Sequence, residues 1–152
     1  MPFILLYLDP WQVLQSQQRR RGIQSVPGMI EPGVFKFTPA QSAVYDLDVY
    51  MAQVLHTYFE KVIAIAAADK HSLLINYNEG AASAMHNIAS VTGIVIDEDY
   101  GQLILQRAGY HGKYPGEVFN EAQTSDTAPV FLLPTIALYY QLEEIRLRQV
   151  SI

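Results

Sequence analysis

Two short apolar segments have the pattern of strands, and segments with the three-to-four-residue spacing of helices lie between and after them. The first run covers residues 2–8 (PFILLYL) and the second covers residues 72–77 (SLLINY). A run that is apolar on both faces is typical of a strand in a parallel sheet. A connection of this length between two strands also favours parallel pairing. We therefore expect one α/β domain over residues 1–152.

Two longer helices are predicted between the apolar runs. Asp9-Pro10 supplies an N-cap and a first helical position for a helix over residues 11–21. Thr38-Pro39 is the same kind of start for a helix that ends near Ala68, in which apolar residues recur every three or four positions. The pattern thus predicts strand, helix, helix, strand.

The second half of the chain is predicted to be mainly helical. Its periodic segments predict helices over residues 81–91, 97–107 and 130–149. Two segments rich in Gly and Pro show no period and are predicted to be loops, over residues 23–37 and 108–126.

Composition favours a folded domain of ordinary size. The chain has 152 residues, of which 50% are hydrophobic and 16% charged, which supports a core and excludes a disordered tail. With no cysteine, disulfides and thiolate metal sites are excluded. No apolar run has the length of a membrane span, and the first residues lack the features of a signal peptide. We expect a cytoplasmic protein without a membrane partner.

Charge argues against a nucleic-acid partner. The net charge is -5, and residues 77–152 carry the whole excess, with four basic and nine acidic side chains. A duplex-binding protein needs a dense basic face, which this chain lacks. The one basic run, residues 19–21, follows a predicted strand-to-helix junction. It is either a solvated helix end or an anion site.

The histidines are scattered singly, and none has the spacing of a metal site or of a metalloprotease motif. His56 is expected on the flank of the long helix, His71 in a turn and His86 on a helix surface. His111 lies in a Gly-rich loop and is the histidine with the strongest case for a functional role. No metal is expected.

Several short motifs, taken in order, resemble the sulfotransferases that use 3′-phosphoadenosine-5′-phosphosulfate (PAPS). Residues 8–16 (LDPWQVLQS) match the family's strand-to-helix motif, in which an Arg and a Ser hold the 3′-phosphate of the cofactor. Residues 77–80 (YNEG) and 92–94 (TGI) are similar to a later strand end and the segment after its helix. Residues 26–30 and 113–116 also look like a bacterial branch of this family.

The resemblance implies transfer of a sulfuryl group from PAPS to a hydroxyl or amine of an unidentified small-molecule acceptor. It implies a 3′-phosphate site at Ser16, with Arg19 or Arg20 nearby and Lys113 on a loop over the nucleotide. Leu8 stands where the family has Arg, and the family's loop for the 5′-phosphosulfate has no counterpart. The implied fold is the C-terminal part of a three-layer α/β/α domain of the P-loop type, with no assigned catalytic residue.

A second hypothesis follows from these departures. The chain is then a catalytically inactive, truncated paralogue that acts as a binding or assembly protein. On either hypothesis the first strand presents an apolar edge, and such edges recruit another strand. We therefore expect a homodimer, or a complex with a partner polypeptide, formed through the first strand.

Overall fold

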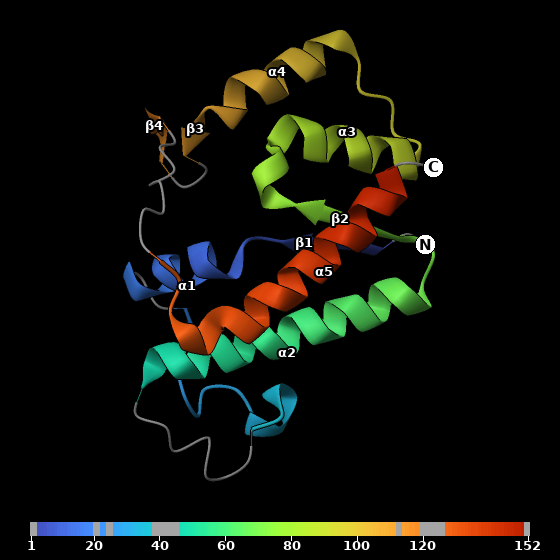
Figure 1. Cartoon of the computed structure of the whole chain (residues 1–152). Helices are drawn as coiled ribbons and strands as arrows, with labels where there is room; N and C mark the ends of the chain where they lie inside the picture. Colours follow the sequence, from blue (N-terminus) through green and yellow to red (C-terminus); the bar gives the residue numbers. More distant parts are fainter. Residues whose placement is uncertain are drawn as a thin grey trace. The chain divides into compact units, whose positions relative to one another are not determined.

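The structure is a computed structural model that describes residues 3–19, 22–23, 26–37, 46–111, 114–118 and 127–150. It contains two compact units, and each is described by itself. The first unit comprises Met1–Tyr7 and His71–Ser125, and the second comprises Leu8–Lys70 and Asp126–Ile152. The content is mixed α/β and mostly helical, with one short parallel sheet of two strands (Figure 1).

The parallel sheet lies in the first unit. Strand β1 (Phe3–Tyr7) pairs in parallel with β2 (Ser72–Asn76), and the register runs from Phe3 opposite Ser72 to Tyr7 opposite Asn76. The predicted parallel pairing is therefore confirmed, and the carboxyl ends of the two strands lie side by side. A sheet of two strands does not confirm the expected three-layer domain of the P-loop type.

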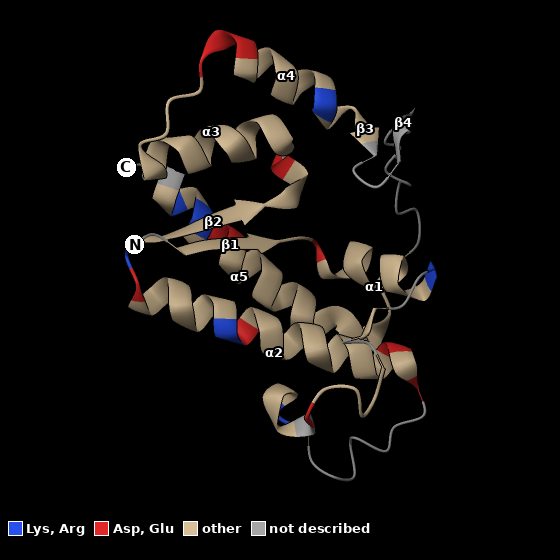
Figure 2. Cartoon of the chain, turned by 180° about the vertical axis from the view of Figure 1, so that it is seen from behind, with Lys and Arg blue, Asp and Glu red and all other residues tan. Residues whose placement is uncertain are grey.

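Three helical elements follow β2 in the first unit: η4 (Tyr77–Glu79), α3 (Ala81–Thr92) and α4 (Glu98–Ala108). Helix α3 ends at Gly93, whose φ of 74° is a left-handed conformation that favours glycine. Helix α4 has two acidic residues in its first turn and Arg107 in its last turn (Figure 2). This order of charges complements the helix dipole.

The predicted loop over residues 108–126 is wrong in part, because it contains a hairpin. Strands β3 (Tyr110–His111) and β4 (Tyr114–Val118) pair in an antiparallel manner, with Tyr110 opposite Val118. Strand β3 has only two residues, and β4 contains Pro115 and Gly116, which are uncommon inside strands, so the sequence gives no strand pattern here. The earlier predicted loop, over residues 23–37, likewise contains a 3₁₀ helix, η2 (Pro32–Phe35).

The second unit is built from helices: α1 (Pro10–Arg19), α2 (Leu47–Ala68), η5 (Val130–Leu132) and α5 (Leu133–Val150). Helix α2 begins later than predicted, because Asp46 is its N-cap. The carboxylate of Asp46 accepts hydrogen bonds from the backbone N–H of Asp48 at 2.9 Å and of Val49 at 3.2 Å. The predicted start at Thr38-Pro39 lies outside the described residues.

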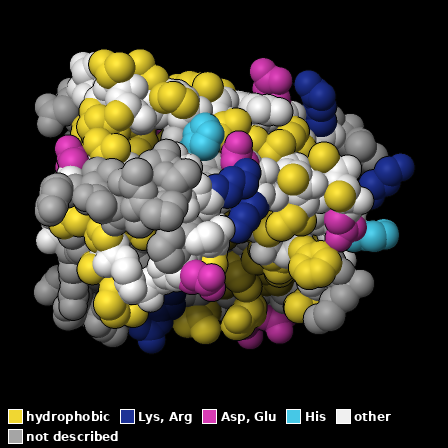
Figure 3. Space-filling view, turned by 90° about the horizontal axis from the view of Figure 1, so that it is seen from below, with side chains coloured by type: hydrophobic (Ala, Val, Ile, Leu, Met, Phe, Trp, Pro, Cys, Tyr) yellow, Lys and Arg dark blue, Asp and Glu magenta, His cyan; other side chains and the backbone are white. Residues whose placement is uncertain are grey.

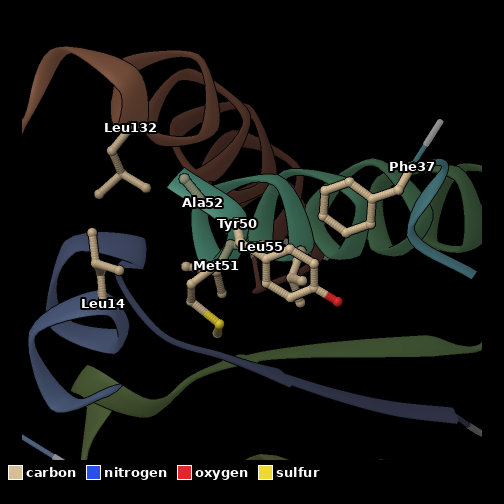
Figure 4. Packing of buried hydrophobic residues seen from close by; sticks show 8 residues of the cluster. Leu14, Phe37, Tyr50, Met51, Ala52, Leu55 and Leu132 are labelled. Atoms are coloured by element: carbon tan, nitrogen blue, oxygen red, sulfur yellow. The ribbon is translucent and has the colours of Figure 1, made fainter. Parts of the chain in front are cut away.

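The core of the second unit joins α1, α2 and η5. Its buried cluster consists of Leu14, Phe37, Tyr50, Met51, Ala52, Val54, Leu55 and Leu132 (Figure 4). Five of these residues, from Tyr50 to Leu55, lie on α2, which packs against both α1 and α5. Tyr58 and Ile65 continue the apolar spacing of α2 but are exposed.

Many hydrophobic side chains remain at the surface of the described residues. On the face drawn in Figure 3 they form patches separated by charged and polar side chains. No helix within the described ranges combines the length and the apolar character needed to cross a membrane.

Candidate functional site

The start of α1 is held by the side chain of Asp9, as the sequence predicts. Its carboxylate accepts hydrogen bonds from the backbone N–H of Trp11 at 2.8 Å and of Gln12 at 3.2 Å. A phosphate at a helix start is normally held by the same kind of main-chain donor. Asp9 therefore competes, through its own negative charge, with a phosphate for these two amides.

Two of the four predicted cofactor-binding residues lie on α1. Ser16 and Arg19 are both exposed. They are three residues apart in a helix, so they lie on the same face. Arg20 and Lys113 lie outside the described residues. The described structure thus places Ser16 and Arg19 on one face of α1, and it does not include the other two predicted positions.

The segment after β2 forms a compact turn that uses the side chain of Glu79. The carboxylate of Glu79 accepts a hydrogen bond from the backbone N–H of Asn76 at 2.9 Å and from the Asn87 amide at 3.2 Å. In return, the Asn76 side chain accepts from the backbone N–H of Asn78 at 3.0 Å. This capping box directs the chain from β2 into α3. Glu79 is therefore a structural carboxylate.

His56 borders a cavity that the sequence analysis did not find. The cavity lies within the second unit, between α2 and the start of α5, and has a volume of about 270 Å³. His56 is on the flank of α2, as predicted, and its Nδ1 lies 3.5 Å from the hydroxyl of Thr135 on α5. These two residues are 79 positions apart, so local spacing gives no signal for the site. His71 lies in a turn and His86 is exposed on α3, as predicted. The side chain of His111 is outside the described atoms.

The charged groups beside the cavity are paired. Nζ of Lys36 lies 2.7 Å from Oε2 of Glu60, and Nε2 of His56 lies 3.8 Å from Oε1 of the same carboxylate. The hydrogen bond from Lys36 holds the pKa of Glu60 below its usual value. In the described part of the chain, no three His, Asp or Glu side chains gather where a metal ion would bind.

The first strand exposes its apolar side chains. Phe3, Ile4 and Leu6 are 59%, 43% and 52% exposed. Among the strands that the structure describes, β1 pairs with β2 alone.

A comparison of the chain with protein-family models, with curated proteins and with solved structures found no match.

Proposed function

We propose that this chain is a sulfotransferase-like protein that acts as an assembly module, in which β1 pairs with β1 of a second copy. The sulfotransferase part of the proposal rests on the sequence motifs alone. The assembly part is supported by the exposure of Phe3, Ile4 and Leu6 on a strand of five residues. Exposed apolar strands at a sheet edge pair with other strands, because pairing satisfies backbone groups and buries side chains together.

A second copy is a suitable partner because β1 carries no charged side chain. Its sequence, FILLY, brings no like charges together when two copies pair in antiparallel fashion. Such pairing about a two-fold axis gives each copy the same contacts, which is the commonest form of oligomer. An unrelated polypeptide that supplies a strand is the alternative partner, and the following experiment distinguishes the two.

The mass of the purified chain at tens of micromolar is measured by light scattering after size exclusion. We expect a dimer for the wild type and for Leu105→Lys, because Leu105 is exposed on α4, away from the strand. We expect a monomer for Ile4→Lys, since a buried lysine at the pairing edge has no counter-charge. A monomeric wild type contradicts assembly of two copies, and a dimeric Ile4→Lys contradicts assembly through β1.

A second test, by cross-linking, does not require that the Ile4→Lys variant folds. The chain has no cysteine, so a single one introduced by substitution has one possible partner, its own copy. Leu5 is the middle residue of β1, and in a symmetric antiparallel pair it lies opposite itself, within the distance of a disulfide. Leu5→Cys is expected to form a cross-linked dimer under mild oxidation, whereas Leu105→Cys is not. Equal cross-linking of both variants argues against the proposed contact.

Binding of PAPS is a second candidate function, supported by the shared exposed face of Ser16 and Arg19. We expect only weak binding by this chain, because Leu8 replaces the family's Arg and Asp9 competes for the amides at the start of α1. Each charge-assisted hydrogen bond that is lost removes about 1.5–3 kcal/mol, or one to two decades of affinity. Calorimetry with 3′-phosphoadenosine-5′-phosphate tests this expectation, and a submicromolar dissociation constant would contradict it. Arg19→Ala is expected to weaken binding further, and Arg107→Ala on α4 is the control.

A further inference from the structure

We propose that the cavity beside His56 binds a small, uncharged aromatic molecule that carries one hydrogen-bonding group. The proposal is independent of the sulfotransferase resemblance and of assembly through β1. It rests on the size of the cavity, its aromatic wall, a buried hydroxyl and the pairing of the nearby charges.

The size of the cavity sets the size of the ligand. An apolar protein cavity of roughly 150 Å³ holds one benzene molecule. The cavity beside His56 measures about 270 Å³, which suits two fused rings or one ring with a short substituent. Pockets for drug-sized molecules begin at roughly 300 Å³, so this cavity is closer in size to a small aromatic molecule.

Aromatic side chains form part of the wall of the cavity. The rings of Phe37 and Tyr50 are stacked, with centroids 4.5 Å apart and planes 7° from parallel. Both rings line the cavity, and Figure 4 shows them side by side. Phe131, from η5, provides a third ring and is half-exposed. Flat faces of this kind favour stacking or edge contacts with another ring.

The hydroxyl of Thr135 supplies the polar contact. Thr135 is 1% exposed and lines the cavity. Its oxygen lies 3.5 Å from the carbonyl oxygen of Ala52 and 3.5 Å from Nδ1 of His56. Hydroxyl hydrogen bonds are usually 2.7–2.8 Å long, and buried hydroxyls usually make at least one good one. A polar group of a ligand that reaches this side chain would offer its hydroxyl a further hydrogen-bond partner.

The charges around the cavity favour an uncharged ligand. His56 faces Glu60 through Nε2, and Glu60 is hydrogen-bonded to Lys36, so the carboxylate and the ammonium compensate each other. None of the described residues that line the cavity is Asp, Glu, Lys or Arg. A charged ligand group would therefore meet no charged partner of these types among the described lining residues, and removing a charge from water without a partner is unfavourable.

Indole is a suitable probe, because it has two fused rings and a single N–H donor. Its binding to the isotope-labelled chain is followed by the shifts of backbone amide signals. We expect saturable binding in the micromolar-to-millimolar range, with the largest shifts at Gln53, His56 and Thr135. The matched probe 1-methylindole lacks the donor and is expected to bind about fivefold more weakly, the value of one neutral hydrogen bond.

Variants separate the cavity from other hydrophobic surfaces. Thr135→Val keeps the shape of the side chain and removes the hydroxyl, so it is expected to bind indole about fivefold more weakly and to abolish the difference between the two probes. Val49→Phe, at the half-open rim of the cavity, fills it and is expected to abolish binding. Thr92→Val on α3 is the matched control and binds as the wild type does. Indole shifts that map elsewhere, or a Val49→Phe variant that binds normally, would overturn the proposal.

Discussion

Leu14→Ala tests whether α1 is an integral part of the helical unit. Leu14 has no exposed surface, and it points from α1 toward Leu132 of η5, which is also fully buried (Figure 4). Replacing a buried leucine by alanine removes its transfer free energy and leaves a cavity, at a loss of about 2–5 kcal/mol. We expect Leu14→Ala to lower the free energy of unfolding by about 3 kcal/mol, because two helices and η5 surround the site and limit how far it can collapse. The expected result is a much less stable second unit.

The chain contains its own reporter for this measurement. Trp11 is the single tryptophan, and it packs against the same cluster from α1. Its fluorescence during urea unfolding therefore follows the second unit. With a urea dependence of about 2 kcal/mol per molar, a loss of about 3 kcal/mol lowers the midpoint by about 1.5 M.

Two controls accompany Leu14→Ala. Leu14→Met preserves volume and is expected to lose less than about 1.5 kcal/mol. Leu105→Ala, on the exposed face of α4, is expected to change stability by less than about 0.5 kcal/mol. A Leu14→Ala midpoint within about 0.25 M of the wild type would refute the packing of α1 against this core.

Two further predictions concern single groups. The pKa of Glu60 is lowered from 4.5, chiefly by its hydrogen bond with Lys36. The ion pair therefore stabilises the fold above pH 4.5, and this contribution is lost as the pH falls through the lowered pKa. In Lys36→Met the Glu60 pKa is expected to rise toward 4.5, and an NMR titration of the side-chain carboxyl carbon that shows no rise contradicts the contact. Gly93→Ala is expected to destabilise the chain by about 1 kcal/mol, because the φ of Gly93 is 74°. Gly101→Ala is expected to stabilise the chain by about 0.4–1 kcal/mol, because Gly101 is inside α4 and an added Cβ meets only Ile96 at 3.9 Å. Denaturation midpoints that shift in the same direction for both glycine variants would contradict these two expectations.

Local signals in the sequence were sufficient for most of the elements. Asp9-Pro10 predicted the start of α1, because a cap acts on its own few neighbours. The two apolar runs predicted β1 and β2 and their parallel pairing, since the connection between them is long. The start of α2 at Leu47 is later than predicted, because the side chain of Asp46 caps it; the predicted start at Thr38-Pro39 lies outside the described residues.

Contacts between distant residues had to come from the tertiary structure. The cavity needs His56 on α2 and Thr135 on α5, which are 79 positions apart, and no periodic pattern relates two such positions. The hairpin of β3 and β4 joins a strand of two residues to one that contains Pro and Gly, so the sequence shows no strand pattern there. The sequence by itself determined where most of the helices and the two parallel strands form, because capping and periodicity are local. The tertiary structure decided which side chains meet, because burial depends on what packs opposite each face.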